Sequence, residues 1–341
     1  MEIIEISGHS LMRVFSLASL SFILAVIATP FFTNWLYKNK IGKRIRQDFN
    51  GQSTPIFSTL HAKKAGVPSM GGILIWLTAA VVTLIFNLER SGTWLPLFCL
   101  VATGIVGAVD DYMNVRGIGP SNGGLAFKYK FILYTSIALV GALWFYFKLD
   151  WNMIHIPRVG DYIIGFWYVP LFVFVLVFTA FATNETDGLD GLAGGLLSIA
   201  YGSYAIICLI AGKPVLAAFC GTIMGALLAF LWFNIYPARF FMGDTGAFSL
   251  GMTLAVIAFL TNSVVILPII ALVLMIEALS FIIQYLSKKL RHGKKVFLSS
   301  PIHHHFEAIG WPETKITMRF WVIGAISGVA GVALALFGRG F

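Results

Sequence analysis

The stretch FWYVPLFVFVLVFTAFATNETDGLDGLAGGLLSIAYGSYAIICLIA, residues 166–211, places a cluster of acids between two apolar runs. Neither residues 166–183 nor residues 196–211 carry a charge. Three acids fall within six residues between these runs: Glu185, Asp187 and Asp190. Each run is close to the roughly 20 residues that an α-helix needs to cross a bilayer. The pattern therefore predicts two membrane helices joined by an acidic turn at the membrane boundary.

The composition of the whole chain is typical of an integral membrane protein. Of its 341 residues, 58% are hydrophobic and 11% are charged, whereas a soluble domain carries roughly 25% charged residues. The apolar runs are continuous rather than alternating, which favours helices over the strands of a barrel. The first run, 14–36, has no small-residue cleavage site after it and is predicted to be a retained helix. Three cysteines lie inside apolar runs, which favours neither a disulfide framework nor a zinc site: Cys99, Cys208 and Cys220.

Apolar segments predict about ten transmembrane helices in a single polytopic, all-α membrane domain that covers residues 1–341. Each segment has about the length that a bilayer-crossing helix requires. The longest loops have only about 30 residues, so no soluble domain is expected. The predicted spans lie near residues 14–36, 70–88, 94–109, 131–148, 166–183, 189–211, 215–235, 246–262, 264–287 and 320–337.

Lysine and arginine are divided unevenly between the two sets of loops. Of the 24 basic residues, 18 lie in one set. The positive-inside rule therefore places that set in the cytoplasm and both termini in the periplasm. Residues 151–168 alternate in polarity around a turn with proline and glycine, which predicts a short periplasmic hairpin. The cytoplasmic loops are 37–69, 110–130, 184–190, 236–245 and 288–319.

Two groups of aspartates stand at helix ends on the predicted cytoplasmic side. Asp110 and Asp111 end one span, and because neighbours on a helix point about 100° apart, we expect them to differ in role. Asn184, Asp187 and Asp190 follow an i, i+3, i+6 spacing, which predicts one face of a starting helix.

Asp244 stands before another apolar run, where a helix N-cap belongs. One interpretation is that Asp187 and Asp244 merely cap helices, with roughly 1 kcal/mol of stabilisation each. Four or more carboxylates gathered at low dielectric repel one another strongly, however, and a divalent cation removes that conflict. Hard oxygen ligands favour Mg²⁺. Two further acids, Asp48 and Glu313, are expected to be solvated instead.

The segment SSPIHHHFEAIGW, residues 299–311, adds three consecutive histidines to a strongly basic loop. Neighbouring side chains diverge, so a single zinc site is disfavoured, and contacts to a phosphate or a sugar fit these histidines better. Lysines and an arginine increase the positive charge on the same side, although membrane orientation and anionic lipid also explain them. These cations are Lys63, Lys64, Lys128, Lys130 and Arg116.

A cation site, basic groups and histidines at a water–lipid boundary suit one kind of reaction. Phosphoryl transfer needs positioning, Mg²⁺ and neutralisation of charge more than covalent help from the protein. The residues therefore predict an enzyme that joins a water-soluble polyanionic phosphate donor to a membrane-held acceptor. Glu277, the one acid within a span, is expected either to pair with a neighbouring helix or to serve a lipid site.

Five stretches, taken in order, resemble the phospho-N-acetylmuramoyl-pentapeptide transferase family of the polyprenyl-phosphate hexose-1-phosphate transferase superfamily. The resemblance covers nearly the whole chain. The middle motifs are shared across the superfamily, whereas the PxMGG and HHHFE stretches are similar to the muramoyl-pentapeptide branch. The five stretches are HAKKAGVPSMGG (61–72), DDY (110–112), NETDGLDGLAGG (184–195), FNIYPARFFMGDTGAFSLG (233–251) and PIHHHFE (301–307).

The resemblance implies a ten-helix fold with periplasmic termini, in agreement with the segment count and the charge distribution. It implies transfer of phospho-N-acetylmuramoyl-pentapeptide from UDP-N-acetylmuramoyl-pentapeptide to undecaprenyl phosphate at the inner leaflet, giving lipid I and UMP in peptidoglycan synthesis. The cofactor implied is Mg²⁺. The implied setting is the bacterial inner membrane, crossed several times, with membrane lipid and a homodimer partner and without nucleic acid.

The resemblance also implies roles for individual residues. Asp244 is implied as the principal Mg²⁺ ligand, with Asp187 as a second ligand. The residues implied for catalysis are Asp110, Asp111, Asp244 and His303, with Asp110 deprotonating or orienting the lipid phosphate. The residues implied for substrate binding are Lys64, Lys128, Lys130, Asn184, Asp187, Asp190, Asn234, Phe241, His304 and His305.

Two positions depart from the family pattern. Asn114 stands where the family often has a lysine four residues after the first aspartate, and Lys128 and Lys130 are both candidates to replace that charge. Glu185 stands where the family commonly has an apolar residue and is left outside the site. Two rival functions stay open at this point: an N-acetylglucosamine-1-phosphate transferase with the same lipid acceptor, and a secondary transporter with carboxylates in the membrane.

Overall fold

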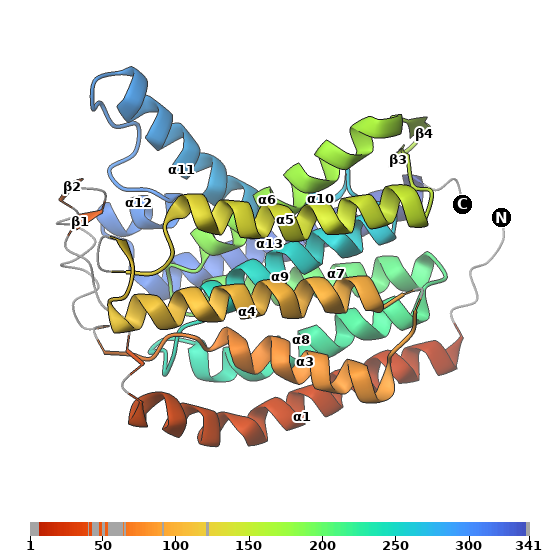
Figure 1. Cartoon of the computed structure of the whole chain (residues 1–341), viewed down its shortest axis with the longest axis horizontal. Coiled ribbons are helices and arrows are strands. Elements are labelled where there is room, and N and C mark those ends of the chain that lie inside the picture. Colours follow the sequence, from red (N-terminus) through yellow and green to blue (C-terminus); the bar gives the residue numbers. More distant parts are fainter. Residues whose placement is uncertain are drawn as a thin grey trace.

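The computed structural model describes a bundle of long helices that run side by side (Figure 1). Its described residues are 7–39, 41–42, 48–49, 52–53, 64, 66–90, 92–120 and 123–338. The mostly helical fold that the composition predicts is confirmed. Among the described residues, seven helical segments are long and apolar enough to cross a membrane, and two apolar helices are shorter.

The long apolar runs form the helices of the bundle. The two shorter apolar helices are α3 (Gly72–Phe86) and α9 (Asp244–Leu260). The longer ones are α1 (Gly8–Lys38), α4 (Trp94–Arg116), α5 (Phe127–Leu143) continued by the π-helix Trp144–Lys148, α6 (Tyr168–Thr186) preceded by the 3₁₀ turn Gly165–Trp167, α7 (Leu192–Ile210), α8 (Pro214–Asn234) and α13 (Glu313–Gly338).

Helix α9 lies in the centre of the bundle, and nearly all of its side chains are buried. Small residues let its neighbours approach closely, as is common where helices pack inside membranes. Gly72 of α3 lies against Gly246, and Gly107 of α4 lies against Thr245. A side chain at Gly251 would lie 2.7 Å from the Cα of Ala180 in α6. This packing fixes the first residue of α9, Asp244, among three helices.

The predicted span 264–287 is divided in the structure. Residues Leu267–Ile270 form the short helix α10, and Leu272–Leu290 form α11. The two helices meet at Ala271, whose ψ of 28° departs from helical geometry. Ile270 packs against Gly331 of α13, whereas the later part of α11 leans away from the bundle (Figure 1). The predicted segment is therefore helical but broken at Ala271, where its two halves turn to different packing partners.

Two short hairpins lie at opposite ends of the bundle. Strands β3 (Met153–Ile156) and β4 (Gly160–Ile163) pair antiparallel, as the alternation predicts, with Met153 opposite Ile163. Strands β1 (Asp48–Phe49) and β2 (Gln52–Ser53) pair antiparallel near the short helix α12 (Ile302–Ala308). The start of α1 and the end of α13 lie at the end of the bundle where β3 and β4 lie, and the candidate site lies at the other end (Figure 1).

Candidate active site

Three carboxylates from two helices converge at one end of the bundle. Asp110 and Asp111 lie near the end of α4, and Asp244 is the first residue of α9. One carboxylate oxygen from each lies within 4.8 Å of the other two. Asp110 is 1% exposed and Asp111 is 5% exposed, so water screens their repulsion poorly. The three side chains therefore form an anionic cluster in a largely dry setting.

Asp111 holds the N-terminus of α9. Its two carboxylate oxygens accept hydrogen bonds from the backbone N–H groups of Asp244 (3.2 Å) and Thr245 (3.1 Å). The preceding N–H, that of Gly243, donates to Oδ2 of Asp187 at 3.0 Å. Free N–H groups at a helix start attract anions. Capping of α9 is thus done by Asp111, while the side chain of Asp244 has other partners.

Lys130 lies between two of the clustered carboxylates. Its ammonium forms an ion pair with Oδ2 of Asp244 at 2.7 Å and another with Asp110. The other oxygen of Asp244 accepts a hydrogen bond from Asn184 at 2.9 Å. Lys128, two residues earlier on α5, is exposed. Of the two lysines that the sequence left open, Lys130 is the one beside the carboxylates.

The loop after α4 folds back over Asp110. The backbone N–H of Leu125 donates to Oδ1 of Asp110 at 2.6 Å. Gly124 has a φ of 76°, and a side chain there would lie 2.7 Å from the same oxygen. Only glycine meets both conditions without strain. Asp110 and Asp111 therefore face different partners, as their positions on the helix predict.

The chemistry of this cluster fits a divalent cation. Three carboxylates and one ammonium leave a net negative charge, and all the oxygens are hard ligands of the kind that Mg²⁺ prefers. Among the described residues, the group within reach of one ion consists of Asp110, Asp111 and Asp244. Asp187 is outside this group, and its carboxylate accepts a hydrogen bond from the N–H of Gly243, the residue before Asp244.

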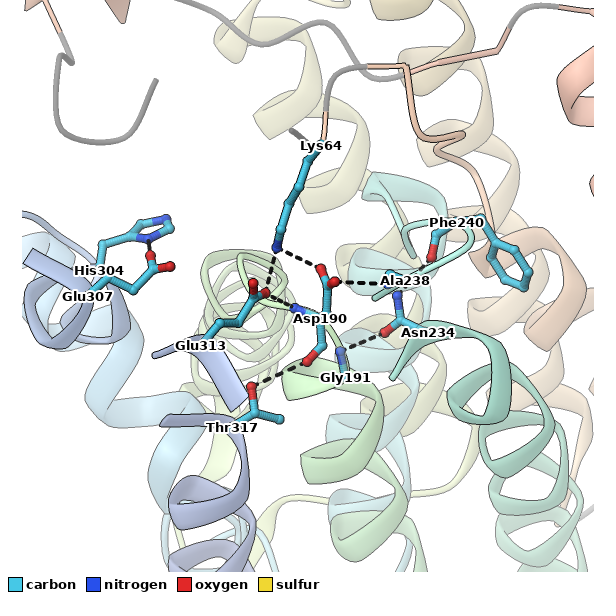
Figure 2. Close-up of polar contacts among 10 residues, drawn as sticks. All are labelled: Lys64, Asp190, Gly191, Asn234, Ala238, Phe240, His304, Glu307, Glu313 and Thr317. Carbon is cyan, nitrogen blue, oxygen red and sulfur yellow. Dashed lines mark hydrogen bonds and ion pairs between the residues drawn. The ribbon is translucent and has the colours of Figure 1, made fainter. Parts of the chain in front are cut away.

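A second polar cluster surrounds Lys64 (Figure 2). Its ammonium pairs with Oδ1 of Asp190 at 2.6 Å and with Oε1 of Glu313 at 2.5 Å. The same Glu313 oxygen accepts the backbone N–H of Asp190 at 2.6 Å. Burial by itself would lower the pKa of Lys64, but the carboxylates of Glu313 and Asp190 outweigh burial and raise that pKa above its ordinary value. The expectation that Glu313 is solvated was wrong, because α13 begins against the turn that carries Asp190.

The loop between α8 and α9 joins this second cluster. Ala238 N–H donates to Oδ2 of Asp190 at 2.9 Å. Asn234 accepts from the N–H of Gly191 at 3.0 Å and donates to the carbonyl of Phe240 at 2.8 Å (Figure 2). The ammonium of Lys64 lies 5.7 Å from the ring centroid of Phe241, within cation–π range. Lys64, Asp190, Asn234 and Phe241 are thus brought together.

The predicted helix face of Asn184, Asp187 and Asp190 does not form. Helix α6 ends at Thr186, Asp187 follows it, and α7 begins only at Leu192. Asn184, in the last turn of α6, and Asp187, just after it, reach the start of α9, whereas Asp190 in the intervening turn reaches Lys64. The i, i+3, i+6 spacing was misread because the glycine-rich segment is a turn rather than a first helical turn.

The three histidines have different hydrogen-bond partners, although the expected divergence does not hold for His303 and His304, whose ring centroids are 4.0 Å apart. Nδ1 of His303 lies 2.8 Å from Oε2 of Glu277, and Nδ1 of His304 lies 2.6 Å from Oε2 of Glu307 (Figure 2). His305 accepts the backbone N–H of Leu298 at 3.2 Å. Among the described residues, the histidines take no part in a metal-binding group. Of the predicted site residues, Lys128 is exposed, and these contacts of the three histidines are with Glu277, Glu307 and Leu298, which lie outside the two carboxylate clusters.

Comparison with known proteins places the chain in a family. The model of glycosyl transferase family 4 matches residues 93–262. The phospho-N-acetylmuramoyl-pentapeptide-transferase of Chloroflexus aggregans is 40% identical over 337 residues, which cover 95% of this chain and 90% of the relative. The enzyme of the same name from Geobacillus sp. (strain WCH70) is 40% identical, with 93% and 96% covered. The one from Chloroflexus aurantiacus (strain ATCC 29366 / DSM 635 / J-10-fl) is 39% identical, with 95% and 90% covered. With this identity over nearly its whole length, the chain belongs to the phospho-N-acetylmuramoyl-pentapeptide-transferase family.

Proposed function

We propose that this protein transfers phospho-N-acetylmuramoyl-pentapeptide from UDP-N-acetylmuramoyl-pentapeptide to undecaprenyl phosphate in a Mg²⁺-dependent reaction, giving lipid I and UMP. The observation that carries the proposal is the convergence of Asp110, Asp111, Asp244 and Lys130 at one end of the membrane bundle. Both substrates bring phosphates, and such a site offers a cation position beside a fixed ammonium.

The residues of the first cluster have distinct tasks in this proposal. Asp244 would hold Mg²⁺, and either Asp187 or the pair Asp110 and Asp111 would supply further oxygens. The ion would neutralise charge on the pyrophosphate of the donor. Asp110 orients the acceptor phosphate or takes its proton. When the substrates bind, their phosphate oxygens become additional anionic partners for the ammonium of Lys130. Asp111 keeps the start of α9, and hence Asp244, in place.

The second cluster is our candidate for the uridine end of the donor. Lys64 and the ring of Phe241 lie together, and Asp190 and Asn234 supply polar groups in the same place. An aromatic face suits the stacking of a base, and a lysine suits an anionic or carbonyl oxygen. His303 and His304, on α12, are the candidates for contacts to the phosphates or the sugar.

The proposed membrane arrangement has ten crossings and both termini in the periplasm. The seven long apolar segments, the shorter helices α3 and α9, and the segment α10–α11 together supply ten. The positively charged loops support a cytoplasmic position for the site in the bacterial inner membrane. The homodimer stays a prediction, which mass measurement in detergent would test.

Purified protein with Mg²⁺ and undecaprenyl phosphate tests the proposal. With UDP-N-acetylmuramoyl-pentapeptide, we expect UMP and a lipid-linked product, and we expect EDTA to abolish both until Mg²⁺ is restored. Product formed only with UDP-N-acetylglucosamine would replace this proposal with the N-acetylglucosamine-1-phosphate transferase. Substrate transport in proteoliposomes without UMP release would favour the transporter, although the clustered acids lie at helix ends rather than at mid-membrane.

A further inference from the structure

Glu277 is a carboxylate buried inside the helical bundle. It lies on α11, and both its side chain and that of His303 are 0% exposed. A carboxylate without water needs a partner inside the protein, and such residues within membrane helices usually serve a function. The partner here is His303, whose Nδ1 lies 2.8 Å from Oε2 of Glu277. The backbone N–H of His303 lies 3.5 Å from the same oxygen.

The other edge of the His303 ring faces the acidic turn. A side chain on Gly188 would collide with Nε2 of His303, so the imidazole packs directly on that glycine. The preceding residue, Asp187, accepts the N–H of Gly243, which comes just before Asp244. His303 therefore lies between the buried Glu277 and the turn that reaches the first carboxylate cluster.

The contact with Glu277 fixes which nitrogen of the His303 ring faces the turn at Gly188. Oε2 of Glu277 faces the backbone N–H of His303 and therefore acts as an acceptor, which places a hydrogen on Nδ1 of His303 and directs Nε2 toward Gly188. Among the described residues, titratable groups near the pair include Glu185 on α6, Asp187 beside Gly188, and His304, whose ring centroid is 4.0 Å from that of His303.

We propose that Glu277 is a positioning residue that holds the His303 imidazole in the orientation and tautomer used for phosphoryl transfer. The kinetic part of this inference rests on the proposed function. Glu277 acts through His303 and touches neither substrate. Its place on α11, a helix outside the motifs of the sequence, explains why spacing along the chain does not reveal the pairing.

The kinetic test compares Glu277→Gln and Glu277→Leu with His303→Ala and with the double variant Glu277→Leu/His303→Ala. We expect kcat to fall about tenfold in Glu277→Gln and about 100-fold in Glu277→Leu and His303→Ala, with KM for the nucleotide donor nearly constant. The double variant should be no slower than His303→Ala. Multiplied losses in the double variant, or full activity in Glu277→Leu, would overturn the proposal. Glu89→Gln, on an exposed residue, is the matched control.

A second readout does not depend on activity. Solid-state NMR of ¹⁵N-histidine-labelled protein in lipid reports the tautomer of each ring, and His303→Gln assigns the His303 signal by its disappearance. We expect a hydrogen on Nδ1 of His303 in the unmodified protein and loss of that signature in Glu277→Leu. An unchanged His303 signal would refute the positioning role. Absence of transfer by the unmodified protein would instead refute the proposed function and leave the NMR result to decide on Glu277.

Discussion

At the scale of residues, the site depends on how like charges are held close together. Asp110, Asp111 and Asp244 would repel one another in a buried setting, and the structure offsets this with Lys130 and with the backbone N–H groups at the start of α9. Both kinds of group are fixed by the fold. The cluster could therefore hold a cation without a large rearrangement.

Replacing Asp244 by asparagine removes one negative charge and keeps the size of the side chain. We expect turnover to fall at least ~100-fold, because charge stabilisation in the transition state is lost. The apparent affinity for Mg²⁺ in a titration of UMP release should also weaken. Asp150→Asn, on an exposed residue, provides the control. Near-normal rates and Mg²⁺ affinity in Asp244→Asn would contradict the ligand role.

The two lysines of α5 give a direct comparison. Lys130→Met should lower turnover about 100-fold, because the ammonium between Asp110 and Asp244 is lost and their repulsion grows. Lys128→Met should lower it much less, since its side chain is exposed. UMP release measured at saturating Mg²⁺ separates the two. An equal loss in both variants would show that Lys128 also reaches the substrates.

Glu313 offers a test of the second cluster. Because the pKa of Lys64 is raised, this lysine is charged at neutral pH, and its contribution to the ion pairs is lost as the pH rises through that raised value. Glu313→Gln should loosen Lys64 and the N–H contact to Asp190, raising KM for the nucleotide donor several-fold with little change in kcat. A loss confined to kcat would assign Glu313 to the chemical step instead.

At the scale of elements, the position of α9 decides the geometry of the site. Gly72 of α3 and Gly107 of α4 let these helices approach the first turn of α9, where Asp244 stands. Hydropathy predicts that this helix exists, because a continuous apolar run follows Asp244. Hydropathy does not predict that another helix caps it, since Asp111 lies 133 residues away from Asp244.

A methyl group between α3 and α9 tests this packing. In Gly72→Ala the new Cβ would collide with the backbone of Gly246, and overpacking of this kind costs about 1–3 kcal/mol. We expect a lower Tm in detergent and a lower rate of UMP release, because Asp244 shifts with α9. The control is Gly8→Ala, where nothing lies within 4 Å of the new methyl group. Equal Tm values for Gly72→Ala and Gly8→Ala would exclude a tight α3–α9 contact.

At the scale of the whole molecule, the bundle has one polar reactive end and one structural end. Helix α12 lies at the first end, and the β3–β4 hairpin lies at the second (Figure 1). A reaction between a soluble nucleotide and a membrane lipid suits such a polarised molecule. The uneven distribution of lysine and arginine predicts that the reactive end faces the cytoplasm.

Thiol labelling in intact cells tests this orientation. Val159 and Val296 are exposed residues in loops at the two ends of the bundle. A membrane-impermeant maleimide should label Val159→Cys in intact cells and Val296→Cys only after permeabilisation. The three natural cysteines are buried and give a low background. The reverse labelling pattern would place the reactive end outside.

The sequence by itself determined the membrane class, the helical fold, the approximate positions of the long apolar helices and the family. These properties follow from local hydropathy and from motifs whose residues are close along the chain. Tertiary structure decided which lysine faces the carboxylates, that Glu313 pairs with Lys64 across 249 residues, and that Glu277 faces His303. These contacts depend on how helices distant in sequence pack together, and no periodicity within one segment encodes that arrangement.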